Sequence, residues 1–231
     1  MSRGSASSRR RFIGVGLAVT IVCLGSATTA ATEPRTRTFS TPEEAFDYLH
    51  QVARNPRCVN CHGMDRGDGR RMPTVGDAMA PHPMNVTAQH NPDGLALGIK
   101  CTSCHGTQDS PEPGGPPGVA DGCPEWQMPI RPMTVLWPAM TKRQLCAKWR
   151  DAVEQSLLRP PLCPGPRPKT ARDFFVEHIE RDHLIEWAFT RGPGREPAPG
   201  SFKQLKAAAR MWAPTLEDPA WCESIKEERS R

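Results

Sequence analysis

The sequence predicts a mainly α-helical protein with extensive irregular loops, and two observations point to this class. Proline and glycine account for 25 and 19 of the 231 residues, which leaves room for few long regular elements. Four segments nevertheless have an apolar stripe at helical spacing, and three of them open with a helix-start signal. Because only 37% of the residues are apolar, the polypeptide alone would build a thin core. We therefore expect a helical domain that is stabilised in part by groups other than packed side chains.

The first expected helix starts at Thr41, where Thr41-Pro42-Glu43-Glu44 has the pattern of a capping box, and it ends before Pro56. Three later segments carry helix-start signals or apolar stripes of the same kind. They predict helices over Thr141–Leu158, Thr170–Thr190 and Ser201–Trp212, the last stopped by Pro214.

The rest of the chain is predicted to be irregular. Residues 61–138 are dense in glycine and proline. Residues 159–170 form a proline-rich connection with an expected stiff backbone, and residues 214–231 are expected to form a C-terminal tail. Since no internal repeat is longer than a pentapeptide, we expect one domain over residues 32–231.

Residues 1–31 have the features of an export signal peptide. They carry four arginines and no acidic residue, followed by an apolar run over residues 13–24 and small residues at 27–31 that suit signal peptidase. The run is short of the roughly 20 residues that span a bilayer, so a retained membrane anchor is the alternative. A twin-arginine signal at Arg9-Arg10-Arg11 is a second alternative. We expect a periplasmic protein that meets a membrane only if the leader is retained.

Removing this leader lowers the net charge from +5 to +1, because the leader holds four basic residues and no acidic one. A nearly neutral mature chain lacks the concentrated basic face that nucleic-acid binding needs, so we expect no nucleic-acid partner. The leader also contains Cys23, and its loss leaves eight cysteines.

Two pentapeptides, Cys58-Val-Asn-Cys61-His62 and Cys101-Thr-Ser-Cys104-His105, have the spacing of covalent haem attachment sites. In such a site two thiols add across the vinyl groups of a haem, and the histidine that follows ligates the iron. Zinc ribbons and redox-active dithiols also use Cys-x-x-Cys pairs, but neither requires a histidine after both pairs. The sequence therefore predicts two covalently attached c-type haems, with His62 and His105 as iron ligands.

The two motifs begin only 43 residues apart, which is too short for two separate small cytochrome domains. The two haems are therefore expected to share one pocket, where they supply buried surface and cross-links that the polypeptide lacks. This makes the predicted fold class a single compact dihaem cytochrome c domain.

The second axial ligand of each iron separates an electron carrier, whose site is filled, from an enzyme or sensor, whose site is open. His82 lies between the motifs in Pro81-His82-Pro83, where proline presents a side chain at low entropic cost. His178 lies in the apolar stripe of the third expected helix, so its imidazole is predicted to point inward. A polar loop residue and a core histidine are the alternative interpretations of these two residues. The less favoured candidate ligands are Met128, Met84 and His90.

Four cysteines lie outside the motifs in the mature chain: Cys123, Cys146, Cys163 and Cys222. An even set in an oxidising compartment predicts two disulfides, and three pairings are possible from the sequence alone.

Several segments resemble a family of small exported dihaem proteins whose members are commonly labelled as a subunit of isoquinoline oxidoreductase. The similarity covers most of residues 50–222, and the order of its segments is more specific than any one of them. The segments are Asn55–His62, His82–Val86, Asn91–Gly94, Cys101–His105, Trp126–Pro129, Gln144–Cys146, Phe175–Ile179 and Gly192–Arg195. The chain departs from the family pattern at Asn55 and Gln127, where a histidine is expected.

The resemblance implies a haem subunit that accepts electrons from a hydroxylase or aldehyde dehydrogenase carrying molybdopterin and iron–sulfur clusters. It favours His82 and His178 as ligands, because both lie in the matching segments, and it implies a disulfide between Cys146 and Cys222. Cys123 and Cys163 look like additions peculiar to this chain, and a bridge between them would tie down the proline-rich connection.

The predicted function is electron transfer from a dehydrogenase or hydroxylase partner to a soluble cytochrome or a terminal oxidase. We find no paired carboxylates, nucleophile with a base, or phosphate loop, so we expect no catalytic residue. A dihaem enzyme such as a peroxidase and a haem-based redox sensor are the alternatives.

Overall fold

The computed structural model describes residues 37–62, 64–65, 71–83, 86, 95–96, 99–112, 115–118, 137–158, 166–192 and 194–227. The chain divides into two compact units, Met1–Pro34 and Arg35–Arg231. All the described residues belong to the second unit. The expected export signal and residues 159–165 of the proline-rich connection lie outside them.

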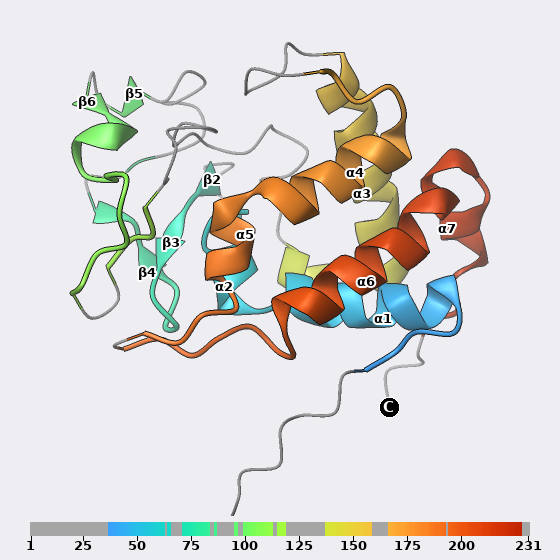
Figure 1. The fold of residues 1–231 in the computed structure, drawn as a ribbon, viewed down its shortest axis with the longest axis horizontal. Coiled ribbons are helices and arrows are strands. Elements are labelled where there is room, and N and C mark those ends of the chain that lie inside the picture. The colour runs from blue at the N-terminus through green and yellow to red at the C-terminus, as the bar shows by residue number, and fades with distance from the viewer. Residues whose placement is uncertain are drawn as a thin grey trace, which may run out of the picture. The chain divides into compact units, whose positions relative to one another are not determined.

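The described part of the second unit is mainly helical, as predicted (Figure 1). The α-helices are α1 (Pro42–Ala53), α2 (Pro56–Val59), α3 (Lys142–Leu157), α4 (Ala171–Arg181), α5 (His183–Trp187), α6 (Phe202–Trp212) and α7 (Trp221–Ser224). Short 3₁₀ helices are η2 (Cys101–Ser103), η4 (Trp137–Ala139) and η5 (Ala213–Glu217). None of these described helices is long and apolar enough to cross a membrane.

The strands form three separate antiparallel pairs of two residues each. They are β1 (Met64–Asp65) with β2 (Arg71–Met72), β3 (Thr74–Val75) with β4 (Ala80–Pro81), and β5 (Leu95–Ala96) with β6 (Ile99–Lys100). Isolated two-stranded pairs of this length have little stability of their own, so neighbouring parts of the chain must hold them.

The helix starts expected at Thr41, Thr141, Thr170 and Ser201 are confirmed. Each of these side chains accepts a hydrogen bond from the backbone N–H three residues later. At Thr141 the side chain of Gln144 also accepts from the Thr141 N–H, which completes a capping box. Such a cap stabilises a helix by about 1 kcal/mol, because it satisfies N–H groups that the helix itself leaves without partners.

The single helix predicted over Thr170–Thr190 is wrong, because the chain breaks it at Asp182 into α4 and α5. Asp182 has φ −76° and ψ 110°, which is extended backbone. Its carboxylate accepts a hydrogen bond from the Leu184 N–H at 2.9 Å and caps α5. The break allows α5 to leave the direction of α4 and to bring Trp187 against Arg57 of α2.

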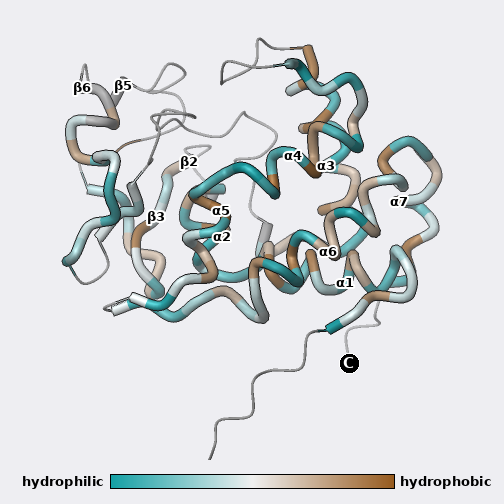
Figure 2. The backbone as a smooth tube through the Cα atoms, in the orientation of Figure 1, coloured by the Kyte–Doolittle hydropathy of each residue, from teal (hydrophilic) through white to brown (hydrophobic). Residues whose placement is uncertain are grey.

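The hydrophobic core lies between α1, α3, α4, α6 and the segment η5–α7, which we call together the helical core. Its centre is Trp212, which is fully buried. The Trp212 indole lies within contact distance of four other aromatic rings, those of Phe46, Trp149, Phe175 and Trp221. Figure 2 shows brown and teal alternating along these helices, as expected of elements with one apolar face turned inward.

The described part of the expected C-terminal tail, residues 214–227, is not a tail. Leu216, Cys222 and Ile225 are all 7% exposed or less. Pro214 ends α6 but does not end the folded structure, because it lies in the first turn of η5, where its missing N–H is harmless. The segment therefore completes the helical core.

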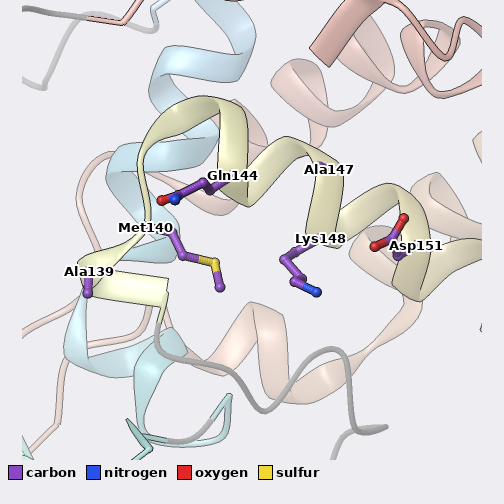
Figure 3. Close-up of a pocket in the computed structure, with 6 residues that line it drawn as sticks. All are labelled: Ala139, Met140, Gln144, Ala147, Lys148 and Asp151. Atoms are coloured by element: carbon purple, nitrogen blue, oxygen red, sulfur yellow. The ribbon is translucent and has the colours of Figure 1, made fainter. Parts of the chain in front are cut away.

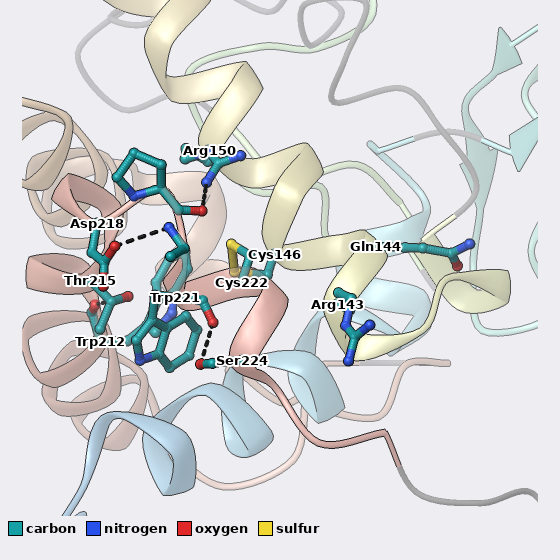
Figure 4. Close-up of a disulfide and its surroundings, with 12 residues drawn as sticks. Arg143, Gln144, Cys146, Arg150, Trp212, Thr215, Asp218, Trp221, Cys222 and Ser224 are labelled. Carbon is teal, nitrogen blue, oxygen red and sulfur yellow. Dashed lines mark hydrogen bonds between the residues drawn. A yellow bond between two sulfur atoms is a disulfide. The ribbon is translucent and has the colours of Figure 1, made fainter.

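A disulfide joins Cys146 of α3 to Cys222 of α7, which is the pairing that the resemblance implies (Figure 4). The Arg150 guanidinium donates a hydrogen bond to the Pro219 carbonyl beside it. The bridge spans a sequence separation of 76 residues and fixes the C-terminal segment to α3.

Candidate functional site

The first motif, Cys58–His62, occupies the end of α2 and the turn that follows. Asn55 caps α2 by accepting a hydrogen bond from the Arg57 N–H at 3.0 Å. The His62 N–H donates to the Cys58 carbonyl at 3.0 Å, so the motif continues as one helical turn. Residues three and four apart share a helix face, and this turn therefore presents Cys58, Cys61 and His62 on one surface.

The second motif, Cys101–His105, adopts the same local structure. The N–H groups of Cys104 and His105 donate to the Cys101 carbonyl at 3.1 and 2.9 Å. Both motifs thus offer two sulfurs and an imidazole from a single turn, as the covalent attachment of a haem requires.

Burial raises the pKa of the Cys58 thiol to about 12 and that of the Cys61 thiol to about 11. The Cys61 thiol adds to the shift at Cys58, and the Asp182 carboxylate adds to the shift at Cys61. Redox-active Cys-x-x-Cys pairs depend on a lowered thiol pKa. The first motif therefore lacks the electrostatics of a dithiol redox centre.

A zinc ribbon would need the four motif sulfurs to converge on one metal ion. All four motif cysteines lie in the described ranges. Within those ranges, no group of three or more Cys, His, Asp or Glu side chains gathers where it could hold a metal ion.

The β3–β4 hairpin is tied to the first motif through Asn60. The Asn60 amide donates to the Gly76 carbonyl at 3.0 Å, and its side-chain oxygen accepts from the Thr74 hydroxyl at 2.7 Å. The Thr74 N–H donates in addition to the Asn60 carbonyl at 2.9 Å. These three bonds hold the hairpin in a fixed place beside the first motif.

The same hairpin delivers His82 to the second motif. The His82 N–H donates to the Pro73 carbonyl at 3.1 Å. The rings of His82 and His105 lie 6.0 Å apart between centroids, with planes 28° from parallel. Nδ1 of His82 donates to the Pro83 carbonyl at 2.7 Å, so Nε2 is the nitrogen left for a ligand. Burial, with His82 nearby, lowers the pKa of His105 to about 4 and keeps that ring in the neutral form that binds metals.

The prediction that the His178 imidazole points into the core is wrong. The side chain is 39% exposed, whereas Phe175 and Ile179 are buried. At 100° per residue, His178 lies about 80° from the direction that Phe175 and Ile179 share, at the edge of the stripe. Its Nδ1 lies 3.5 Å from the carboxylate of Asp182, and the same carboxylate raises the pKa of the Cys61 thiol.

A stack of three side chains beside the first motif was missed by the sequence analysis. The guanidinium carbons of Arg57 and Arg195 lie 4.6 and 4.7 Å from the ring centroid of Trp187. Arg57 is only 6% exposed. One nitrogen of each side chain is shielded from solvent without a hydrogen-bond partner: Nη2 of Arg57, Nε of Arg195 and Nε1 of Trp187. An unmet buried donor costs about 1–3 kcal/mol, so three together call for a physical reason.

A local signal for this stack exists in the turn before Arg195. A Cβ atom at Gly192 would lie 2.3 Å from Nε of Arg195, so only glycine lets the guanidinium fold back over that backbone. Gly194 has φ +67°, which also favours glycine. The pattern Gly-Pro-Gly-Arg thus encodes a turn that aims Arg195, although no sequence rule says at what.

Some predicted residues lie outside the described part of the chain. They are the candidate ligands Met84, His90 and Met128 and the cysteines Cys123 and Cys163.

A separate surface pocket of about 460 Å³ lies against α3 (Figure 3). It is lined by Ala139, Met140, Gln144, Ala147, Lys148 and Asp151. None of the predicted site residues is among them, so the pocket is distinct from the two motifs.

Comparison of the chain with known protein families, with curated proteins and with solved structures finds no match. The interpretation of the site therefore depends on the geometry of its own residues.

Proposed function

We propose that this protein is an exported electron carrier with two covalently attached c-type haems. The observation that carries the proposal is the pair of His82 and His105, whose ring centroids lie 6.0 Å apart beside the thiols of the second motif. These two imidazoles and the two thiols of the second motif are the groups that would hold a c-type haem.

The second haem would be held by the thiols of Cys101 and Cys104, with His105 and His82 as the iron ligands. The hydrogen bond from Nδ1 of His82 to the Pro83 carbonyl supports this role. A ligating histidine commonly donates its other N–H to a carbonyl or carboxylate, which fixes the orientation of the ring.

The first haem would be held by Cys58 and Cys61, with His62 and His178 as iron ligands. The Asp182 carboxylate supports His178, because it lies 3.5 Å from the ring nitrogen that the iron would not use. A carboxylate in this place orients the ring and makes the opposite nitrogen a stronger ligand. The Asp182 carboxylate also raises the pKa of the Cys61 thiol, and this supports a link between His178 and the first motif.

A haem iron supplies one-electron chemistry by cycling between its ferric and ferrous states. With His82 and His178 in these roles, neither iron keeps an open position for a small molecule. This favours an electron carrier over a dihaem peroxidase or a haem-based sensor.

The proposed partners follow from the resemblance. The donor would be a molybdenum hydroxylase or an aldehyde dehydrogenase, and the acceptor a soluble cytochrome or a terminal oxidase. The Cys146–Cys222 disulfide fits an oxidising compartment such as the periplasm.

The cofactor is tested by producing the full chain in a host that attaches c-type haem and exports the product. We expect two haems for each chain, which stay with the polypeptide in acidified acetone. Pigment that leaves the polypeptide, or zinc found in place of iron, would refute the proposal.

The axial ligands are tested by carbon monoxide binding to the reduced protein. We expect the wild-type protein to resist carbon monoxide and the variant His82→Ala to bind one molecule per chain. The matched control is His183→Ala, because His183 is a part-exposed histidine that lies 3.7 Å from Asp109 and has no proposed role at an iron. Binding by the wild type would instead indicate an open site and an enzyme or sensor.

A further inference from the structure

We propose that Arg57, Trp187 and Arg195 bind the carboxylate of a haem propionate, an inference that rests on the proposed function. The three side chains come from α2, from α5 and from the turn after α5, and only the fold brings them together.

The donors of this stack define the chemistry of its ligand. The nitrogens without partners on Arg57, Trp187 and Arg195 all carry N–H groups and cannot accept a hydrogen bond. An ionised carboxylate is the complementary group, since it only accepts, through two oxygens with about four lone-pair sites. Hydrogen bonds between such an anion and guanidinium groups are among the strongest in proteins.

The charge balance points to the same class of ligand. Two guanidinium cations share one indole ring, and the charge of Arg195 lowers the pKa of Arg57, whereas those of Asp77 and Glu196 raise it. Among the described residues, no carboxylate forms an ion pair with Arg57 or Arg195. An anion between the two cations would offset this repulsion.

The acidic side chains nearby have other partners. The Asp77 carboxylate accepts a hydrogen bond from the Glu196 N–H at 2.9 Å. The Glu196 carboxylate is 79% exposed and lies 3.8 Å from Arg191. Asp77 and Glu196 still favour the Arg57 cation at a distance, but neither carboxylate accepts a hydrogen bond from Nη2 of Arg57, Nε of Arg195 or Nε1 of Trp187.

Both haem sites adjoin the stack. Arg57 directly precedes Cys58 of the first motif. The Arg195 guanidinium donates to the Gly115 carbonyl at 3.1 Å, in the segment that follows the second motif. Each haem carries propionates, so the ligand chemistry is the same from either source and the experiment must tell them apart.

Two variants test the inference in the full, haem-loaded protein. Trp187→Phe keeps an aromatic ring for the stack but removes the Nε1–H donor. Arg195→Met keeps most of the apolar stem but removes the charge and its donors. Arg191→Met is the matched control, because it removes the same charge from an exposed side chain four residues away in the sequence.

The readout is the propionate bending band in the resonance Raman spectrum, which responds to hydrogen bonds on the carboxylate. We expect the band to shift in Trp187→Phe and in Arg195→Met and to stay in place in Arg191→Met. We also expect Arg195→Met to lower one reduction potential, since losing a nearby cation favours the ferric iron. Bands that are unchanged in both test variants would overturn the inference.

A redox titration assigns the propionate to its haem. Adding His82→Met raises the potential of the second haem, because a thioether ligand disfavours the ferric state relative to imidazole. If Arg195→Met lowers the reduction potential of the same haem whose potential His82→Met raises, the propionate belongs to the second haem. If Arg195→Met lowers the potential of the other haem, the propionate belongs to the first. A wild-type protein without two haems would refute the proposed function, whereas two haems with unchanged Raman bands would refute only the propionate site.

Discussion

The helical core and the motif region, by which we mean the described residues between 55 and 118, fill their interiors differently. The core packs the large side chains of five helical elements around Trp212 and is crossed by a disulfide. In the described part of the motif region, the buried apolar side chains are Val59, Met72, Pro73, Val86 and Pro117, and none of them belongs to the hydrophobic core cluster. The motif region instead presents thiols, imidazoles and guanidinium groups.

The two regions therefore owe their ordered structure to different interactions. The helical core is complete as a polypeptide, because its apolar faces cover one another. The motif region has pairs of two-residue strands and turns, and it is held by hydrogen bonds such as those of Asn60. On the proposed function, two haems would supply the buried surface that this region lacks.

The largest expected effect comes from removing the four motif thiols together, as Cys58→Ser, Cys61→Ser, Cys101→Ser and Cys104→Ser. We expect the exported variant to lack haem and to keep its helical core, because the core makes few contacts that need the motifs. Amide hydrogen exchange measures this directly. Protection in α1 and α6 should stay near the wild-type level, and protection in residues 99–112 should be lost.

Two results would break the comparison between the regions. Protection that persists in the motif region would show that it needs no cofactor. Loss of protection in α1 and α6 would show that the core depends on the haems as well. The variant Cys146→Ala with Cys222→Ala, which removes the disulfide of the core and leaves the motif thiols in place, is the comparison variant.

That disulfide variant is itself the second prediction. In the chain-entropy picture, a bridge across a separation of 76 residues stabilises the folded state by about 4 kcal/mol. Urea unfolding followed by tryptophan fluorescence should show a loss of this size, since Trp149, Trp212 and Trp221 all lie in or against the core. The haem absorption spectrum should stay unchanged if the core and the motif region are separately organised. A changed spectrum would show that the haem sites depend on the Cys146–Cys222 disulfide.

The contrast between the helical core and the motif region also explains which features could be predicted from the sequence. The starts of α1, α3 and α6 follow from local capping residues at Thr41, Thr141 and Ser201, and local rules found them. The break at Asp182 escaped, because a helix-compatible sequence continues through it and the competing interactions come from capping α5 and from His178.

The two motifs were visible because their chemistry fixes a short local spacing. The stack of Arg57, Trp187 and Arg195 was not, since its members lie far apart in the sequence and each looks like an ordinary surface residue. The packing of Leu216 and Ile225 was missed for a related reason, because short apolar segments after a proline carry no period that separates a core segment from a tail.

The third prediction concerns the β3–β4 hairpin, which links the two motifs. Thr74→Val keeps the shape of the side chain but removes the hydroxyl that donates a hydrogen bond to the side-chain oxygen of Asn60. We expect a loss of about 1–2 kcal/mol in the free energy of unfolding. If the hairpin holds His82 in place, the reduced variant should also bind carbon monoxide faster than the wild type.

The matched control for this variant lies in the helical core. The Thr215 hydroxyl donates to the Trp212 carbonyl at 2.8 Å. Thr215→Val should cost a comparable part of the stability and leave carbon monoxide binding unchanged. Equal effects of the two variants on carbon monoxide binding would show that the hairpin has no special link to His82.

The smallest expected effect is a pH dependence that belongs to the helical core alone. His50 of α1 is 8% exposed, and burial lowers its pKa from 6.5, helped by Arg54 and Lys142 and opposed by Asp47 and by the Met140 carbonyl. The unfolded chain therefore takes up a proton near pH 6.5 that the folded chain resists. Stability is greatest above this pH and falls as the pH drops toward the folded pKa, by at most about 1.4 kcal/mol per pH unit.

His50→Gln keeps a donor for the Met140 carbonyl but cannot titrate, so the difference in unfolding free energy between wild type and variant should change below pH 6.5 and stay constant above it. A constant difference across the whole range would show that His50 does not link protonation to folding.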